Sequence, residues 1–434
     1  MAFTSDKRTL RIPILLIAIF LCAFLINTLE KESFKAATGR AFAKTEDGTI
    51  NAFFCPEEEC RERLIELISG ANEVKCAFYT IDDKFADFLA NKSKEINLSI
   101  GLDSDSYEKI KGKLNGNFFP IFSAGIMHNK FCIFDRRIVF TGSYNPTEGD
   151  SYYNNNNILV ISSKTLAKNY ESKFEELRCR NIGCKSVASR ENFLKINEIP
   201  VENYFCPEDS CTDKLIGKIR SAKESILFMT FSFTEKKIAE EISEMQINGI
   251  EAKGVFEKRQ ESNYSVFKYL NESGVLVKLD ENPYVMHHKV FIIDNETVIT
   301  GSFNPSANAN YRNDENILII KDREIAARYL EEFSEVWNYP KNDAYECPES
   351  ECLQISNVKY KGGKGKEIIE IYNPAPFPKN LEYIFIKSSR NSMRLSGIIN
   401  QGSFQEIIPK FRLSDKNGTI FLLNSSRIID SFSW

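Results

Sequence analysis

One phrase of eighteen residues occurs twice in this chain and constrains its fold more than any other feature. Residues 128–145 and 287–304 both read H-x-K, four residues, D, six residues, G-S-x-N. Together they hold all three histidines of the 434 residues. The flanking sequence repeats as well, since 55–80 resembles 206–231. A repeat of roughly 150 residues predicts two copies of a whole domain rather than a solenoid of small units.

Each copy alternates helical and strand-like patterns. Residues 60–71 carry apolar side chains at helical spacing, with Pro56 near the first turn, and the β-rich run 74–80 follows. Amphipathic helices are expected to close the copies at 166–178 and 325–337. The order helix, strand, helix, strands, helix predicts an α/β sheet that is buried on both faces. Polar connectors are expected at 30–50 and 185–200.

The last part of the chain has a different pattern. From residue 353, short apolar runs alternate with turn residues and no convincing helix is present, which predicts a β-sandwich. Residues 353–434 contain twelve Lys/Arg and six Asp/Glu, a net charge of +6, although the whole chain carries -4. A basic domain beside acidic ones suggests a polyanion or an anionic surface as partner, and a mixed-charge soluble surface is the alternative. The basic run "KYKGGKGK" begins at Lys359.

The N-terminus is typical of a targeting segment. Lys7, Arg8 and Arg11 precede an apolar run at 12–26. A basic flank before such a run predicts a signal anchor within residues 1–30, and a cleaved signal peptide is the alternative. We therefore expect an extracytoplasmic protein that is membrane-anchored or secreted.

Most cysteines occur in C-x4-C pairs that open each repeat or follow its end. An extracytoplasmic location permits disulfides, whereas zinc sites usually use closer pairs or add histidines. Cys76 and Cys132 lie in apolar runs and are predicted to be buried thiols, and Cys22 lies in the anchor. The predicted disulfide cysteines are Cys55, Cys60, Cys179, Cys184, Cys206, Cys211, Cys347 and Cys352.

The repeated phrase gathers polar groups at one end of a hairpin. His128 and Lys130 are two residues apart, so on a strand they would share a face. A two-residue turn after Asp135 would then place Asn145 opposite His128 and Ser143 opposite Lys130. The second copy repeats this set with His287, Lys289, Asp294, Asn304 and Ser302.

These residue types suit a phosphate. Lysine ammonium groups neutralise phosphate oxygens, and the Ser and Asn side chains are expected to donate hydrogen bonds to them. One imidazole can attack phosphorus while the other protonates the leaving oxygen and later activates water. Two such histidines exist, so pseudo-two-fold packing of the copies predicts a site that a monomer can complete.

The doubled motif resembles the phospholipase D superfamily over roughly residues 50–340. The resemblance implies a phosphodiesterase that works through a phosphohistidine without metal or cofactor. It also implies an acidic residue that orients histidine. The second copy has Glu315 at this position, whereas the first copy has the amide Asn156. We therefore expect unequal histidines, with His287 as the nucleophile. Asp135 and Asp294 are expected to be structural turn or ion-pair residues.

The C-terminal segment resembles the lamin-tail domain, an immunoglobulin-like module, which implies a binding or tethering role. The predicted fold is α/β. It has two tandem phospholipase D-like α/β/α repeats packed with pseudo-two-fold symmetry, at 50–184 and 200–345. An all-β immunoglobulin-like sandwich follows at 353–434.

Three functions fit this sequence. The first is a nuclease, with DNA as the favoured substrate, and the basic C-terminal segment supports it. The second is a phospholipase D at a membrane, which the predicted anchor supports. The third is a non-catalytic surface binding protein. Lys258 or Arg259 can reach a polar substrate in the first two cases, and a solvated loop is the alternative.

Overall fold

The computed structural model describes most of both repeats and much of the C-terminal segment. The described residues are 44–114, 118–183, 190–338, 352–360, 367–376, 378–381, 384–388, 392–409, 413, 418–424 and 427–434. The predicted anchor at 12–26 and the basic run at 361–366 lie outside them. Within these ranges, no helix combines the length and apolarity that a bilayer crossing requires.

Repeat one is a mixed seven-stranded sheet in the order β2-β8-β7-β6-β3-β4-β5. Strands β3, β4 and β5 run parallel, and the remaining neighbours are antiparallel. The strand bounds are β2 Thr49–Cys55, β3 Glu73–Phe78, β4 Asn97–Asp103, β5 Phe118–Ile121, β6 Lys130–Phe134, β7 Ile138–Gly142 and β8 Asn156–Ser162.

Helices cover both faces of this sheet because strands and helices alternate along the chain. Asp82 caps α3 by accepting from the Phe85 N–H, and Ser163 caps α6 by accepting from the Leu166 N–H. Helix α6 ends at Ile182, and the next residue, Gly183, caps it with a φ of 68° that suits glycine. The bounds are α2 Cys60–Gly70, α3 Asp83–Lys92, α4 Ser104–Ile110, η2 Lys111–Lys113, α5 Glu148–Tyr152 and α6 Lys164–Ile182.

Repeat two reproduces this order and adds two strands at one edge. Its sheet runs β1-β9-β10-β16-β15-β14-β11-β12-β13, and β1 pairs parallel with β9. Both predicted connectors thus contribute a strand, which the short runs did not reveal. The strands are β1 Lys44–Glu46, β9 Phe193–Ile196, β10 Ile199–Cys206, β11 Ser225–Thr230, β12 Glu251–Phe256, β13 Leu276–Leu279, β14 Lys289–Ile293, β15 Thr297–Gly301 and β16 Glu315–Lys321. The helices are α7 Cys211–Ile219, α8 Lys236–Ile247, η3 Lys258–Gln260, α9 Phe267–Glu272, α10 Ala307–Tyr311 and α11 Arg323–Trp337.

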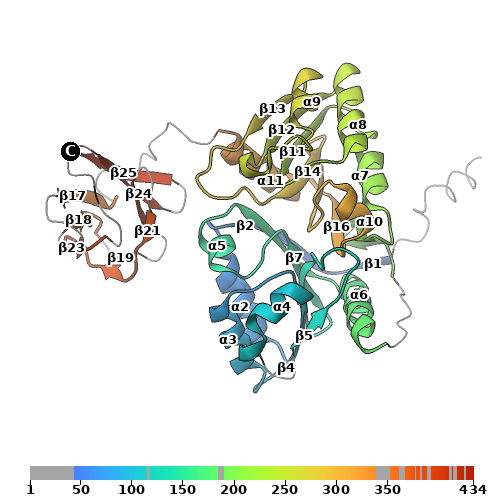
Figure 1. Ribbon diagram of the computed structural model, residues 1–434, viewed down its shortest axis with the longest axis horizontal. Coiled ribbons are helices and arrows are strands. Elements are labelled where there is room, and N and C mark those ends of the chain that lie inside the picture. Colours follow the sequence, from blue (N-terminus) through green and yellow to red (C-terminus); the bar gives the residue numbers. More distant parts are fainter. Residues whose placement is uncertain are drawn as a thin grey trace, which may run out of the picture.

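The two repeats share one apolar cluster, and the closing helices α6 and α11 lie within it (Figure 1). Helix α6 contacts β3, β6 and β7 of its own sheet and also β10 of repeat two. Helix α11 contacts β11, β14 and β15 and also β2 of repeat one. Tyr170, Phe174, Tyr329 and Phe333 are buried there. This reciprocal packing gives the pseudo-two-fold arrangement that places the two motifs together.

The motif hairpins differ from the predicted register. Phe134 pairs with Ile138, so three residues form the turn instead of two. Asp135 and Arg136 adopt left-handed φ values of 48° and 54°. The second hairpin has the same turn. The predicted facing of Ser143 with Lys130 is therefore wrong by one residue, and a one-residue shift turns side chains to the other face. Both histidines also precede the strands, which begin at the motif lysines.

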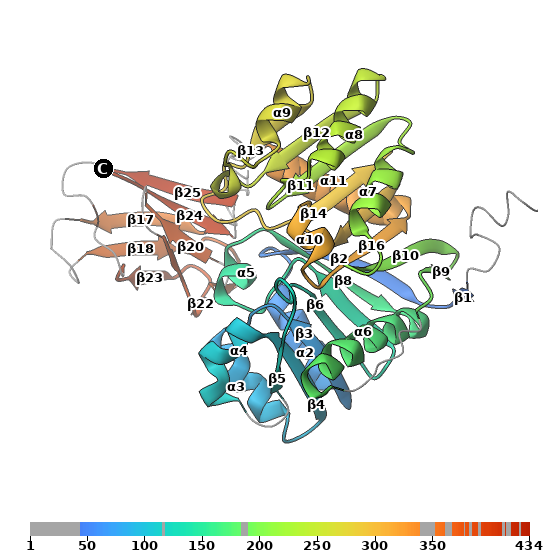
Figure 2. The ribbon, with the colours of Figure 1, turned by 45° about the vertical axis from the view of Figure 1, so that its right-hand side comes forward.

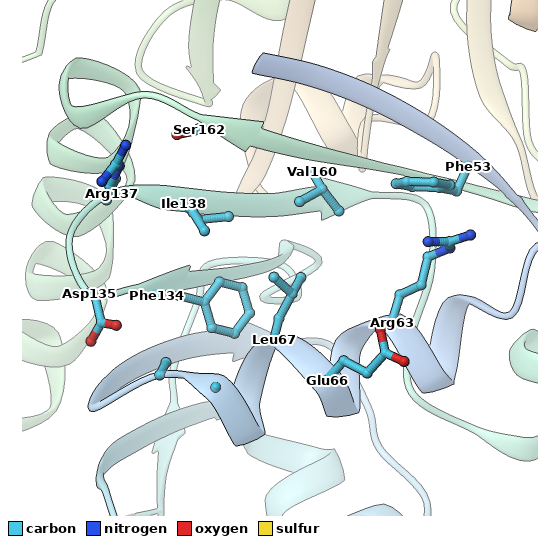
Figure 3. A pocket seen from close by; sticks show the side chains of 12 residues that line it. Phe53, Arg63, Glu66, Leu67, Phe134, Asp135, Arg137, Ile138, Val160 and Ser162 are labelled. Carbon is cyan, nitrogen blue, oxygen red and sulfur yellow. The ribbon is translucent and has the colours of Figure 1, made fainter. Parts of the chain in front are cut away.

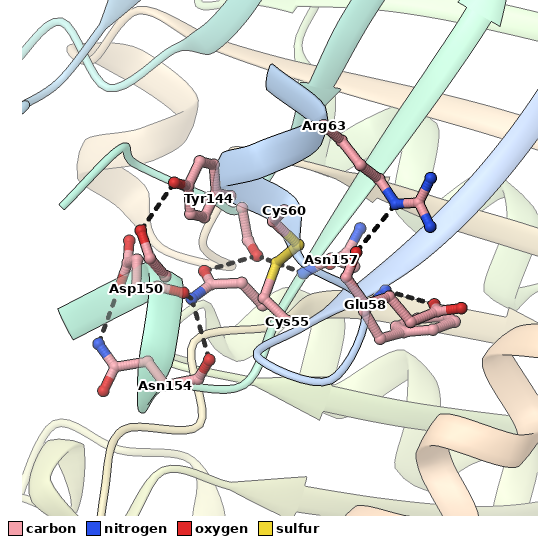
Figure 4. The surroundings of a disulfide bond; sticks show 12 residues. Cys55, Glu58, Cys60, Arg63, Tyr144, Asp150, Asn154 and Asn157 are labelled. Atoms are coloured by element: carbon pink, nitrogen blue, oxygen red, sulfur yellow. Dashed lines mark hydrogen bonds between the residues drawn. A yellow bond between two sulfur atoms is a disulfide. The ribbon is translucent and has the colours of Figure 1, made fainter. Parts of the chain in front are cut away.

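The structure confirms two predicted disulfides and corrects one pair of cysteines. Cys55–Cys60 is bonded, with Cα atoms 5.7 Å apart (Figure 4), and Cys206–Cys211 is bonded with Cα atoms 5.8 Å apart. In each pair the first cysteine ends a strand and the second begins a helix. The predicted free thiols Cys76 and Cys132 are bonded as well, because β3 and β6 pair these residues directly, with Cα atoms 4.0 Å apart. Cys179 and Cys352 are also disulfide-bonded, and their predicted partners Cys184 and Cys347 lie outside the described residues.

The C-terminal segment is all-β in the described residues. Two sheets, β17-β18-β23 and β21-β20-β24-β25, enclose an apolar cluster, and β19 pairs with β22. This unit lies beside both repeats (Figure 2). Its likeness to the lamin-tail domain stays a prediction. The bounds are β17 Gln354–Lys359, β18 Ile368–Tyr372, β19 Lys379–Asn380, β20 Ile384–Lys387, β21 Ser392–Arg394, β22 Ile398–Ile399, β23 Phe404–Ile407, β24 Thr419–Asn424 and β25 Arg427–Ser433.

Candidate active site

The backbone before each motif pairs with the other repeat. Met127 forms a parallel bridge with Asp314, and Asn155 forms one with Met286. The His128 N–H donates to the Asp314 carbonyl at 2.9 Å, and the His287 N–H donates to the Asn155 carbonyl at 2.8 Å. Both histidines are thus held at the interface between the repeats.

The polar partner of each histidine also comes from the opposite repeat. Nδ1 of His128 lies 2.9 Å from both carboxylate oxygens of Glu315, and Nδ1 of His287 lies 2.9 Å from Oδ1 of Asn156. We expected Glu315 to serve His287, and this pairing is wrong because the bridges cross between repeats. A hydrogen bond at Nδ1 fixes the ring and leaves Nε2 for chemistry.

The motif serines bind the partners of the histidines. Ser143 Oγ donates to Asn156 Oδ1 at 2.9 Å and accepts from the Asn157 N–H at 3.0 Å. Ser302 Oγ donates to Glu315 Oε2 at 2.6 Å and accepts from the Asn316 N–H at 3.0 Å. Both hydroxyls thus have a donor and an acceptor partner within the protein, and their predicted contact with phosphate stays a prediction.

The motif asparagines differ between the repeats. Nδ2 of Asn145 donates to Asp150 Oδ2 at 2.9 Å, whereas repeat two has Ala309 where repeat one has Asp150. The amide oxygens of Asn145 and Asn304 are buried without a hydrogen-bond partner within the described residues. Sequence reasoning did not find Asp150, which lies outside the repeated motif.

Two buried ammonium groups accompany the histidines. Lys130 Nζ donates to the His128 carbonyl and Lys289 Nζ to the His287 carbonyl, each at 2.7 Å. No carboxylate forms an ion pair with either lysine in the part of the chain that the structure describes. Burial lowers the pKa of Lys130 to about 8. Burial, followed by repulsion from Lys130, holds the pKa of Lys289 well below its usual value. An anion bound beside the two ammonium groups would therefore stabilise their charged forms.

His128 and His287 lie in different charge environments. Burial lowers the pKa of His128, and the adjacent Glu315 carboxylate opposes this shift. Burial and then the Lys289 charge hold the pKa of His287 well below its ordinary value. Both imidazoles are therefore neutral near pH 7 in the empty site.

One aromatic ring flanks each histidine. Tyr79 follows β3 and lies 5.4 Å from His128, edge to face, and Phe231 follows β11 and lies 4.8 Å from His287. Their rings also lie 5.5 and 4.9 Å from the Nζ atoms of Lys130 and Lys289 respectively. Sequence reasoning missed these rings, although the two occupy equivalent positions in the repeats.

The motif aspartates lie at the far end of the hairpins. Asp135 Oδ1 accepts from the backbone N–H groups of Asn72 and Glu73, each at 2.9 Å. Asp294 accepts from the N–H groups of Lys223 and Glu224. Each aspartate therefore ties the hairpin turn to the start of a neighbouring strand.

The third histidine stabilises the interface and lies outside the site. His288 Nε2 lies 2.7 Å from Glu332, and Nδ1 lies 3.3 Å from Asn157 of repeat one. Asn129 has the equivalent position and accepts from Asn316 Nδ2 at 2.9 Å. Burial and then the nearby Lys289 charge lower the pKa of His288 to about 3, so the ring is neutral.

A cluster of carboxylates lies beside the strand that carries Glu315. Glu176, Glu208 and Asp314 converge, and the buried Lys173 ammonium lies 2.9, 2.8 and 3.3 Å from them. Arg180 adds a further contact to Asp314 at 2.7 Å. The cluster is a compensated ion-pair network that fixes the position of residue 314 and hence of the neighbouring Glu315.

Comparison with known proteins identifies the family. Residues 60–178 and 215–337 match the family model described as "Cardiolipin synthase, PLD-like domain". A phospholipase D of Rickettsia felis is 34% identical over 157 residues, which cover 35% of this chain and 78% of that protein. Human mitochondrial cardiolipin hydrolase is 30% identical over 130 residues, 30% of this chain and 52% of that protein.

A solved structure shares the fold across both repeats. Phosphatidylserine synthase of Haemophilus influenzae superposes with a TM-score of 0.52 at 14% identity, over 66% of this chain and 86% of that one. The two segments that match the family model cover more than half of the sequence. The chain therefore belongs to the phospholipase D-like family, and it is a phosphodiester hydrolase.

Proposed function

We propose that this protein hydrolyses phosphodiester bonds of nucleic acid, DNA above all, through a phosphohistidine on His128. The observation that carries this proposal is the pair of buried lysines beside two imidazoles. Lys130 and Lys289 lack carboxylate partners among the described residues. A bound phosphate would place negative charge beside both ammonium groups and raise the pKa of each lysine toward its usual value.

The first chemical step forms a bond between His128 Nε2 and phosphorus. The bond from phosphorus to the leaving oxygen breaks, and that oxygen takes a proton from Nε2 of His287, which enters this step in its imidazolium form in the substrate complex. Attack leaves a positive charge on the His128 ring, which the Glu315 carboxylate at Nδ1 stabilises. This carboxylate now favours His128 as the nucleophile, in place of His287.

The second step releases the phosphate. His287 is neutral after the first step, so its Nε2 takes a proton from water as the water oxygen attacks phosphorus. The phosphorus–nitrogen bond breaks, His128 returns to its neutral form, and a phosphomonoester leaves. The lysines stabilise the charge that develops on the phosphate oxygens, the role that a metal ion has in other phosphodiesterases.

A basic aromatic seam beside the site supports a polyanionic substrate. The ring of Tyr153 lies 4.9 Å from Tyr284 and 5.6 Å from Phe385 of the C-terminal domain. Burial, followed by the charge of Lys258, lowers the pKa of Lys387 on β20. Two like charges beside the half-buried rings of Tyr153 and Tyr284 suit a phosphate backbone and its bases.

Arg259 is committed to the adjacent loop. Its guanidinium donates to the carbonyls of Pro283 and Tyr284 and pairs with Glu257 at 2.9 Å. Lys258 Nζ donates to the Asn282 carbonyl at 2.8 Å. Of the two candidates from the sequence, Lys258 is therefore the one we assign to substrate binding.

Hydrolysis of phospholipid is the second candidate, because the relatives are named phospholipase D and cardiolipin hydrolase. An apolar groove of about 640 Å³ lies between α2 and β6–β8, with Phe53, Leu67 and Phe134 in its lining (Figure 3). This groove reaches Asp135, which follows the end of β6 remote from Lys130. A five-residue strand spans roughly 16 Å, so the groove does not hold an acyl chain beside the phosphate site.

The test uses full-length protein in detergent with EDTA present. We expect cleavage of single- or double-stranded DNA, with His128→Ala as the inactive control. Release of headgroups from phosphatidylcholine or cardiolipin vesicles without DNA cleavage would establish the second candidate. DNA binding without turnover would indicate a binding protein. Activity lost to EDTA and restored by magnesium would contradict the two-histidine chemistry.

A further inference from the structure

A carboxylate lies near each of the two site histidines, and the two carboxylates occupy different positions within their repeats. In repeat two the carboxylate is Glu315, at the start of β16, and the residue equivalent to Asp150 is Ala309. In repeat one the residue equivalent to Glu315 is Asn156, and Asp150 lies six residues earlier on α5. Each repeat therefore supplies one carboxylate to this region, in exchanged positions.

Asp150 lies behind the imidazole of His287. Its Oδ2 is 3.7 Å from Nδ1 of His287, next to the hydrogen bond that this nitrogen makes with Asn156. The carboxylate is 6% exposed. Oδ2 accepts from the Asn145 N–H at 3.0 Å and from its Nδ2 at 2.9 Å. Oδ1 accepts from Asn154 Nδ2 at 2.8 Å (Figure 4).

These hydrogen bonds fix Asp150 and leave its charge directed at the ring. Three N–H donors hold the carboxylate in a fixed orientation at a buried position. Burial, followed by the charges of Lys289 and Lys130, lowers the pKa of His287 and favours the neutral ring. A bound phosphate reduces the repulsion that the two ammonium groups exert on a protonated ring, and the Asp150 carboxylate lies 3.7 Å from Nδ1 of that ring. His128 and His288 are the other titratable groups that face His287.

We propose that Asp150 is the positioning residue that keeps His287 protonated for its role as general acid in the substrate complex. Asp150 thereby compensates for the amide of Asn156, which stands where repeat two has a carboxylate. Each imidazole then has one carboxylate: Glu315 contacts His128 directly, and Asp150 acts on His287 through space. The inference rests on the proposed function, since it takes His287 as the proton donor. A general acid must hold its proton, so loss of the carboxylate should lower the pKa of His287 in the complex.

The first experiment compares pH profiles of kcat for the wild type and Asp150→Asn, with DNA as substrate. We expect kcat to fall about tenfold and the alkaline limb to move about one pH unit lower. The loss should be smaller with bis(4-nitrophenyl) phosphate, because 4-nitrophenolate leaves without needing a proton. An alkaline limb that stays in place would overturn the proposal.

Rescue separates a charge effect from a structural one. Asn156→Glu copies the arrangement of repeat two, and Asp150→Ala copies Ala309. The double variant should return the alkaline limb toward the wild-type position, although it lacks all hydrogen bonds of Asp150. Failure of a folded double variant to do so would assign Asp150 a purely structural role. The double variant also provides this answer if Asp150→Asn alone does not fold.

Nuclear magnetic resonance gives a readout that does not need turnover. Only three histidines occur in the chain, so ¹⁵N-histidine labelling reports each imidazole separately. With inorganic phosphate present, Asp150→Asn should lower the pKa of His287 by about one unit and that of His128 by less. Equal shifts at both rings would contradict a specific role. A wild-type protein without phosphodiesterase activity would instead reject the proposed function and leave this titration result standing.

Discussion

The imidazole of His128 in repeat one contacts the carboxylate of Glu315 in repeat two, with Nδ1 2.9 Å from each oxygen. The reverse contact pairs His287 of repeat two with Asn156 of repeat one. The candidate site is therefore completed only when the repeats pack together, and the two halves make different contributions to it.

This pairing predicts which histidine becomes phosphorylated. His128→Ala and His287→Ala should each lower turnover of DNA by about a thousandfold or more, since each ring serves its own step. With bis(4-nitrophenyl) phosphate, His287→Ala should accumulate an acid-labile phosphohistidine on residue 128, measurable by mass spectrometry. His288→Asn, which copies Asn129, is the matched control and should turn over the substrate without accumulating the adduct. Phosphate found on residue 287 in the wild type would reverse the assignment.

Glu315→Gln should change the acid side of the pH profile. The nucleophile must be neutral, and the carboxylate raises the pKa of His128 relative to an amide. Its removal should therefore move the acid limb of kcat/KM to lower pH. The maximal rate should fall about tenfold to a hundredfold, because the cationic phosphohistidine loses its counter-charge. An acid limb that moves to higher pH would contradict this role of Glu315.

The basic seam should determine how binding to long DNA depends on salt. Lys258→Ala and Lys387→Ala should each reduce the slope of log K against log[salt] by about 0.9, the value for one phosphate contact. Fluorescence anisotropy at several salt concentrations measures this slope. Lys236→Ala, on the exposed start of α8, is the control and should keep the wild-type slope. Unchanged slopes in both seam variants would remove the C-terminal domain from the nucleic-acid interface.

Peptide mapping without reduction should recover three linkages within the described residues: Cys55–Cys60, Cys76–Cys132 and Cys206–Cys211. The second joins adjacent strands of repeat one, so its loss should lower the melting temperature by several degrees, as for other buried crosslinks. Cys76→Ser tests this change. Free thiols at all six positions, or stoichiometric zinc, would contradict both the oxidised state and the predicted compartment.

The doubled motif was enough to predict the family and the α/β fold of both repeats. The residue types at fixed spacing between His128 and Asn145 predict phosphodiester chemistry without a structure. The hairpin register was beyond such reasoning, because two turn residues, Asp135 and Arg136, adopt left-handed backbone angles that their side chains do not require. A turn of three residues then shifted every expected pair across the hairpin.

Contacts that depend on packing were the other source of error. The linkage of Cys76 to Cys132 requires the register of β3 on β6, which local sequence does not specify. The partners of the histidines depend on which repeat contributes Glu315, and sequence order alone favoured the nearer histidine. Asp150 was missed for a related reason, since its significance appears only when its distance to His287 is known.

The crossed contacts between the repeats have a consequence for the ancestry of such a chain. A symmetric dimer of repeat one would place an amide behind both imidazoles, and a dimer of repeat two would place a carboxylate behind both. Two identical subunits must treat their histidines alike, whereas a fused gene can let them diverge. One polypeptide that holds both halves can therefore give the two rings different surroundings, as the proposed roles of attack and proton transfer require.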